Sequence, residues 1–310
     1  MSVLRDLVAP FADMATAPLF LVEVLIGGVA SGLLYSLVAL GFVLIFKASG
    51  VFNFAQGAMV LFAALTLVGL MEHGVPVVLA LLLTIAVMVL LAFAIERIVL
   101  RPLVNQEYII LFMATIGLNF FLEGFGEMLW GANVKKLDVG VPDTSFKVAG
   151  ILVNRLEISA ALTAAVLVTV LAVFFQRTRI GRALRAVADD HEAALSIGIP
   201  LKTIWVVVWS VAGLVALAAG VMWGAKSGVQ FSLSLIALKA LPVLILGGFT
   251  SVPGAIAGGV IIGVGEKLAE VYWGPLVGGA IENWFAYVMA LGFLLVRPQG
   301  LFGERIIERV

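Results

Sequence analysis

The residues of this chain that could do chemistry gather in a few short polar segments between long apolar runs. One such segment, 189–200 (DDHEAALSIGIP), begins with acids and ends with a glycine and a proline. Asp189 can cap a short helix there, because acids suit the positive end of the helix dipole, and Gly198 and Pro200 suit its end. Its alanines leave one face small enough to enter a groove on a partner. We therefore expect a docking helix over 189–199.

Two further segments, near residues 50 and 250, interrupt apolar runs with polar residues and glycines. An amide inside a membrane must find a hydrogen-bonding partner, and broken helices expose backbone groups where they line a pathway. The alternative is a tight turn at the membrane surface, and the sequence favours neither. Asn119 and Glu123, four residues apart on one helical face, form a third polar pair. The candidate residues of the pathway or its gate are Asn53, Gln56, Gly57, Asn119, Glu123, Gly247 and Gly248.

The sequence carries none of the common signatures of an enzyme. It lacks a G-x-x-x-x-G-K-[ST] phosphate loop, a G-x-S-x-G elbow and an H-E-x-x-H helix. Its two histidines are far apart and it has no cysteine, so a metal site and thiol chemistry are not expected. We expect no enzymatic activity and no cofactor, so that any ATP involved is bound by another subunit.

The elements that must position these segments are membrane helices. Of the 310 residues, 63% are hydrophobic and 12% charged, against about 45–50% and about 25% in soluble domains. Nine helices of about 20 apolar residues would use about 180 residues, and the chain has roughly 195 apolar residues. The composition excludes a soluble enzyme and a nucleic-acid-binding protein. It predicts an all-α polytopic membrane protein, a bundle of about 8–10 transmembrane or re-entrant helices.

Nine apolar runs are the candidate membrane segments. The first run is long for one straight span, so it is either tilted or broken near Gly41. The seventh is short and contains Pro242, which is typical of a broken or re-entrant element. The runs cover residues 19–46, 51–72, 75–98, 108–130, 157–176, 203–225, 235–250, 253–272 and 279–297.

The lysines and arginines of the loops predict the orientation. The loop 176–202 has the largest number of basic residues, which places it in the cytoplasm and leaves 131–156 as an external loop. Alternation within 139–158 indicates a short hairpin there. Arginines upstream of residue 189 are expected to contact lipid phosphates. The whole chain, 1–310, then forms one transmembrane domain.

Glycines and isolated charges complete the pattern. Small-xxx-small pairs allow close backbone packing of helices in lipid, either in a rigid bundle or in helices that slide, and the sequence does not separate these alternatives. The pairs are Gly28/Gly32, Gly220/Gly224, Gly254/Gly258 and Gly259/Gly263. A charge at the bilayer centre costs ~2.5–3.5 kcal/mol, so charges at depth must face protein or water while the others snorkel to the interface. The ionisable residues concerned are Glu23, Glu123, Glu127, Lys226, Lys239, Glu266, Lys267, Glu270 and Glu282.

Several of these segments together resemble one known family. The run 192–194 (EAA), followed by Gly198, matches the start of the EAA-loop pattern of ABC importer permeases. Residues 32–57, 96–102, 179–186 and 246–259 resemble, in the same order and spacing, the branched-chain amino acid permeases of the LivH type, and the resemblance covers about residues 25–303. Gln56 departs from the family, which commonly has a histidine there, so a role that needs an imidazole at this position has no residue to perform it.

The resemblance implies a fold like that of the type II ABC importers and a subunit that moves branched-chain or related small amino acids into the cytoplasm, across the bacterial inner membrane. It also implies partners: a second permease subunit, usually LivM-like, two ABC ATPase subunits and a periplasmic substrate-binding protein. The alternatives are a permease for urea, short amides or small aromatic acids, and an ion-coupled secondary transporter, which would need membrane carboxylates such as Glu123. The residues implied to couple to the ATPase are Asp190, Glu192, Ala193, Ala194 and Gly198.

Overall fold

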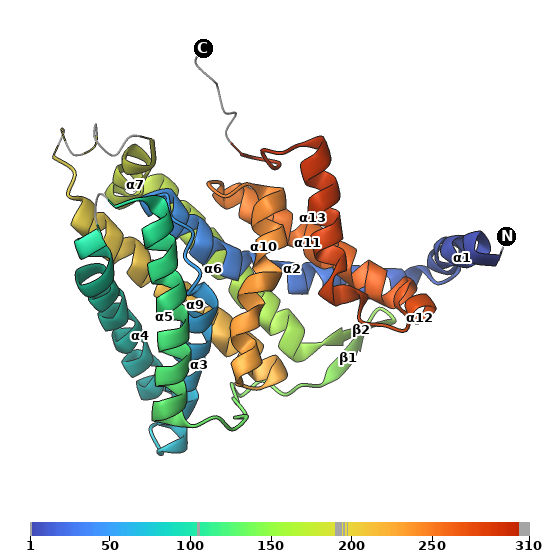
Figure 1. The fold of residues 1–310 in the computed structure, drawn as a ribbon. Coiled ribbons are helices and arrows are strands. Elements are labelled where there is room, and N and C mark those ends of the chain that lie inside the picture. Colours follow the sequence, from blue (N-terminus) through green and yellow to red (C-terminus); the bar gives the residue numbers. More distant parts are fainter. Residues whose placement is uncertain (1, 104–105, 190–193, 195, 197, 304–310) are drawn as a thin grey trace, which may run out of the picture.

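The computed structural model describes residues 2–103, 106–189, 194, 196 and 198–303 as a bundle of helices with one small hairpin (Figure 1). The helices are α1 (Ser2–Thr16), α2 (Pro18–Ser49), α3 (Gln56–Glu72), α4 (Val77–Ala94), α5 (Tyr108–Trp130), α6 (Arg155–Arg177), α7 (Arg179–Asp189), α9 (Leu201–Ser227), α10 (Ile236–Gly247), α11 (Val252–Tyr272), α12 (Gly274–Val277) and α13 (Phe285–Val296). A π-helical turn (Ile95–Leu100) and a 3₁₀ turn (Arg101–Leu103) extend α4, while the 3₁₀ turns Phe231–Leu235 and Ile281–Asn283 precede α10 and α13.

Each of the nine apolar runs contains a helix, which confirms the predicted all-α class. Six helical segments are long and apolar enough to cross a membrane, namely α2, α4 with its extension, α5, α6, α9 and α11. The other three, α3, α10 with its 3₁₀ turn, and α13, are shorter apolar helices. The last run begins later than predicted, because residues 279–284 form a glycine-led turn before α13.

Helix α2 is the central element of the bundle. It runs without interruption for 32 residues, about 48 Å at 1.5 Å per residue, so the predicted alternative of a break near Gly41 is wrong. Within its most apolar window 78% of the residues are buried, against 22% in α6. The remaining helices therefore pack around α2, and those at the periphery present their apolar side chains outward.

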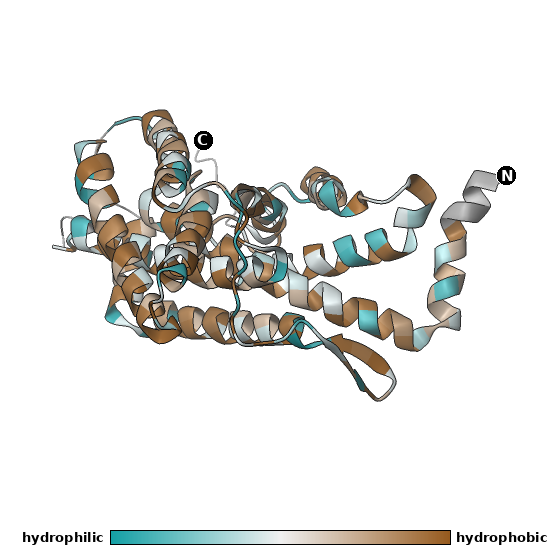
Figure 2. Ribbon diagram, turned by 90° about the horizontal axis from the view of Figure 1, so that it is seen from below, coloured by the Kyte–Doolittle hydropathy of each residue, from teal (hydrophilic) through white to brown (hydrophobic). Residues whose placement is uncertain are grey.

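The outer helices carry the surface that lipid would cover. Large apolar side chains such as Leu82 and Leu90 on α4 and Leu162 on α6 are exposed. Figure 2 shows that most helical ribbon is hydrophobic and that hydrophilic residues form separate bands and connections. In lipid such exposure costs nothing, whereas in water it would be unfavourable. The pattern is that of an integral membrane protein.

Two of the predicted glycine pairs meet where α2 crosses α11. A Cβ atom added to Gly32 would lie 2.5 Å from the backbone oxygen of Gly259, and one added to Gly28 would lie 2.7 Å from the Cα of Val264. Gly263 faces the backbone of α2 in the same way. The two backbones are therefore in direct contact, as expected for helices that associate by close packing rather than by burying apolar surface.

Outside the nine apolar runs, the structure has a hairpin that the sequence predicted and a helix, α1, that it did not. Strands β1 (Ser145–Val148) and β2 (Ile151–Asn154) pair antiparallel, with Ser145 opposite Asn154, which confirms the hairpin in the 131–156 loop. Helix α1 was not among the nine runs, because it is short and carries Arg5, Asp6 and Asp13 between its apolar residues. It lies at the far end of α2 from α7 (Figure 1).

Candidate functional site

The first interruption, between α2 and α3, is a compact turn built by its own polar residues. Gly50 ends α2 with a φ of 68°, a left-handed conformation that glycine adopts without strain. Asn53 Oδ1 accepts a hydrogen bond from the backbone N–H of Ala55 at 3.1 Å, and Asn53 Nδ2 donates to Gln56 Oε1 at 3.4 Å. Both side chains are fully buried. Asn53 and Gln56 thus fix the turn, and their predicted role in the pathway stays a prediction.

Gln56 explains why a glycine stands at position 41 of an unbroken helix. A Cβ atom on Gly41 would collide with the side-chain amide of Gln56. The amide lies across α2 at this point and donates from Nε2 to the backbone oxygen of Ala212 on α9, at 3.4 Å. Next in sequence, Gly57 packs directly on the backbone oxygen of Ser234, in the 3₁₀ turn before α10. The start of α3 therefore joins α2, α9 and α10.

The predicted polar pair Asn119 and Glu123 lines a small cavity next to this turn. The cavity, of about 70 Å³, lies between α5 and the start of α10, and its wall includes Phe54 from the interruption. Asn119 is 8% exposed, whereas Glu123 is half-buried. The structure thus brings the polar face of α5 next to the α2–α3 turn, although the two are more than sixty residues apart.

The second interruption, between α10 and α11, lies against the end of α2. Lys47 Nζ donates to the backbone oxygen of Thr250 at 3.4 Å, and the rings of Phe46 and Phe249 are 5.6 Å apart. Ser251 caps α11 by accepting from the N–H of Gly254 at 3.0 Å. The two glycine-containing interruptions therefore meet at one end of the bundle, through a contact between residues 203 apart in the chain.

Gly247 and Gly248 both serve backbone packing at this second interruption. Gly247 abuts the backbone of Gly254, and Gly248, with a φ of 102°, abuts that of Gly303. The chain after α13 closes the junction, because Leu301 N–H donates to the backbone oxygen of Leu246 at 2.8 Å. Both predicted gate glycines therefore lie at a three-way contact between α10, α11 and the C-terminal segment.

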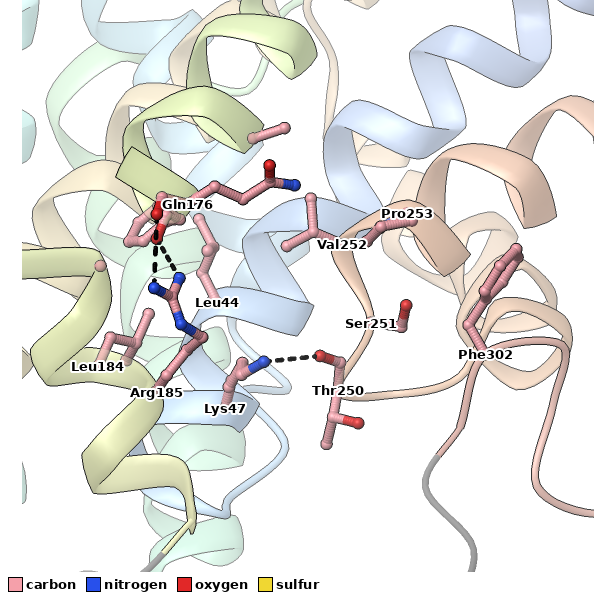
Figure 3. A pocket seen from close by; sticks show the side chains of 13 residues that line it. Leu44, Lys47, Gln176, Leu184, Arg185, Thr250, Ser251, Val252, Pro253 and Phe302 are labelled. Carbon is pink, nitrogen blue, oxygen red and sulfur yellow. Dashed lines mark hydrogen bonds between the residues drawn. The ribbon is translucent and has the colours of Figure 1, made fainter. Parts of the chain in front are cut away.

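A cavity of about 270 Å³ separates this junction from α6 and α7 (Figure 3). Lys47 lines one side, where it holds the α10–α11 turn, and Arg185 of α7 lines the other. Arg185 donates to the backbone oxygens of Phe175 and Gln176, at 2.5 and 3.4 Å, and so ties α7 to the end of α6. Cations at helix C-termini stabilise the exposed carbonyls there.

Helix α7 leads directly into the predicted coupling segment. Asp190, Glu192 and Ala193 lie outside the described residues. Asp189 is the last residue of α7, and the helix that it was predicted to cap would begin in the undescribed residues, so this capping stays a prediction. Ala194 is 2% exposed and packs in the core instead of facing outward. Gly198 is exposed, has a φ of 82° and has open space around it. Of the described coupling residues, Gly198 is thus the one at the surface.

A buried charged group on α11 is the main feature that the sequence pattern did not single out as a site. Glu266 is 4% exposed. Its Oε1 accepts from Tyr35 Oη at 3.1 Å and from Lys239 Nζ at 2.8 Å. The sequence named Glu266 among the charges that must face protein or water if they lie at depth, and its hydrogen-bond partners are protein side chains. Nothing local in the sequence linked it to Tyr35 on α2 and Lys239 on α10.

The fold and these junctions define the class of the protein: a polytopic integral membrane protein in which the turns between α2 and α3 and between α10 and α11 meet at one end of the bundle. A family model described as "Branched-chain amino acid transport system / permease component" matches residues 24–297. The chain belongs to this family of permease components. It is a transport subunit of the inner membrane rather than an enzyme, and membership of the family implies ATPase and substrate-binding partners.

Three curated relatives are each 28% identical to this chain. The first is the high-affinity branched-chain amino acid transport system permease protein LivH of Salmonella typhimurium, matched over 94% of this chain and 98% of that protein. The second is the corresponding protein BraD of Pseudomonas aeruginosa, matched over 92% of this chain and 97% of that protein. The third is the probable LivH of Methanocaldococcus jannaschii, matched over 90% of this chain and 92% of that protein. Among solved structures, PsaBC from Streptococcus pneumoniae in complex with Fab has a TM-score of 0.49 at 12% identity, over 87% of this chain and 89% of that one. This likeness is too weak to add to the assignment.

Proposed function

We propose that this chain is the permease subunit through which branched-chain amino acids enter the cytoplasm. It works with a LivM-like second permease subunit, two ABC ATPases that bind the ATP, and a periplasmic substrate-binding protein. The observation that carries the proposal is the family match across residues 24–297, together with relatives whose names state branched-chain amino acid transport.

The contacts at the end of α2 support a route from the ATPases to the pathway. The ATPase exerts its force on residues 189–199, and α7 transmits this force because Arg185 fixes α7 to the end of α6. The cavity between α7 and the Lys47–Thr250 contact lets the two sides approach or separate. Gly247 and Gly248 then move with the α10–α11 turn and act as the gate, while Asn53, Gln56 and Gly57 anchor the opposite side of the junction.

The test is uptake by proteoliposomes that contain this chain with its co-purifying permease, ATPase and binding-protein partners. ATP-dependent accumulation of radiolabelled leucine, inhibited by isoleucine and valine, is the expected result. Uptake of urea, a short amide or a small aromatic acid in place of leucine would show that the substrate belongs to the alternative class. Leucine uptake driven by an ion gradient, without the ATPase, would show an ion-coupled transporter and refute the proposal.

A further inference from the structure

A third cavity lies at the other end of the bundle from the Lys47–Thr250 contact. It has a volume of about 220 Å³ and opens among α2, α9, α10 and α11. Val229, which follows α9, exchanges two backbone hydrogen bonds with Lys135 of the 131–156 loop, at 2.8 and 2.9 Å. The cavity therefore lies towards the side of that loop, which the charge pattern predicts to be external and where a delivered substrate would first enter.

Two residues that line this cavity, Glu266 and Trp223, each carry a buried polar atom that has no hydrogen-bond partner among the described residues. One is Glu266 Oε2, an acceptor, whose neighbour Oε1 is satisfied by Tyr35 and Lys239. The other is Trp223 Nε1, a donor. A buried polar group without a partner costs about 1–3 kcal/mol. One unmet acceptor and one unmet donor in a single cavity thus call for a ligand that offers both.

The charges around the cavity fit a ligand that carries both signs. Lys226, Lys239 and Lys267 line it, and the acids that line it are Glu266 and Glu282. Lys226 is paired with Glu157 at 2.7 Å and Lys239 with Glu266 at 2.8 Å, so the charges around the cavity nearly balance. A ligand of one sign would disturb this balance, whereas a ligand that carries both signs would keep it. We infer that this cavity is an entry site for a small zwitterionic amino acid, whose ammonium group donates to Glu266 and whose carboxylate accepts from Trp223 Nε1 and the lysine side chains.

The geometry also holds the two binding atoms in place before a ligand arrives. The Tyr35 and Trp223 rings are stacked, with centroids 5.6 Å apart and planes 19° apart, and Lys226 Nζ lies 5.8 Å from the centroid of the Trp223 ring. Tyr35 in turn donates to Glu266. Because the indole and the carboxylate are joined through Tyr35, their separation is fixed by packing, which lowers the cost of binding.

The size of the cavity limits the ligand and its affinity. Drug-sized ligands occupy pockets of about 300–1,000 Å³, so a volume of about 220 Å³ admits a small amino acid and excludes a peptide. The ammonium group would have a single protein acceptor, Glu266, and two of the lysines near the carboxylate already form ion pairs. Weak binding is what a transport path requires, since the substrate must leave as well as enter.

This inference rests on the proposed function, and direct binding separates the two. The permease complex in nanodiscs, without its binding protein, is examined by saturation-transfer NMR with L-leucine, glycine, 3-methylbutylamine and 4-methylpentanoate. Trp223→Phe keeps the ring and removes only the N–H, and Glu266→Gln keeps the shape and removes the charge. Each should weaken leucine binding about tenfold, which corresponds to ~1.4 kcal/mol. The amine should respond to Glu266→Gln alone and the carboxylate to Trp223→Phe alone.

Trp130→Phe is the matched control, because Trp130 Nε1 is also buried without a partner among the described residues but lies on α5, outside this cavity. It should leave leucine binding at the wild-type level. Glycine binding that depends on Glu266 and Trp223, with no leucine binding, would keep the zwitterion site and refute the branched-chain cargo. Two results, each together with ATP-driven leucine uptake, would refute the zwitterion site but leave the proposed cargo standing. One is leucine binding that is equal in wild type and both cavity variants, and the other is no detectable binding of any zwitterion.

Discussion

Replacing Gly32 by alanine tests whether α2 and α11 are held together by direct backbone contact. The added Cβ would lie 2.5 Å from the backbone oxygen of Gly259 and 2.8 Å from the Cα of Val260, while ordinary contact begins near 3.4 Å. Both neighbours are backbone atoms, so neither can rotate away. The helices must therefore separate by roughly 1 Å, a gap that forfeits a quarter to a half of the dispersion attraction between facing atoms.

The expected cost follows from these distances. Overpacking of this kind costs about 1–3 kcal/mol, and the better helix propensity of alanine returns at most about 1 kcal/mol. Because lipid provides no hydrophobic force to hold the helices together, nothing else compensates. We expect Gly32→Ala to lower the free energy of unfolding by about 1–2 kcal/mol on balance. Titration with SDS in mixed micelles, followed by tryptophan fluorescence, measures it.

Gly117→Ala on α5 is the matched control for this substitution. Gly117 is a helical glycine with open space around the position of a Cβ atom, so alanine there should leave stability unchanged or raise it by up to about 1 kcal/mol. Equal free energies of unfolding for the two variants would refute the account of the α2–α11 crossing. A loss confined to Gly32→Ala would support it.

Two further substitutions test the α2–α3 turn and the coupling segment. Gly41→Ala should reduce ATP-driven uptake and thermal stability, because its methyl group collides with the Gln56 amide, and Gln56→Ala added to it should restore stability; failure of this rescue would contradict the contact. Gly198→Trp should abolish both uptake and stimulation of the ATPase while membrane insertion persists. Gly74→Trp is its control, since Gly74 has the same φ of 82° and open surroundings at a different turn, and equal loss in both variants would show strain rather than lost docking.

The sequence predicted the elements well because membrane helices are a local property. Continuous apolar runs, loop arginines and polar interruptions are each readable within about 20 residues, the length that a bilayer requires. The glycine pairs of α2 and α11 were likewise visible, although the sequence did not say that these two pairs face each other. Helix α1 was missed for the same local reason, since its charges dilute its apolar residues below the pattern of a span.

The polar groups required the tertiary structure. Gly41 could be read from the sequence as a helix break, but it makes room for Gln56, which reaches across from the next helix. Ala194 could be read as part of an exposed docking face, but it packs inside the bundle. In each case the deciding contact comes from another element, so it cannot be predicted from the local composition.

The sequence by itself determined the class of this protein and the places where its helices are interrupted, because hydropathy and helix-breaking residues act over short stretches of chain. Tertiary structure alone decided which interruptions meet and which polar atoms are left without partners. Tyr35 and Glu266 are 231 residues apart in the chain and 3.1 Å apart in the fold. Their pairing depends on how α2 packs against α11. The glycines allow this packing, but nothing in the local sequence shows that these two helices are the ones that meet.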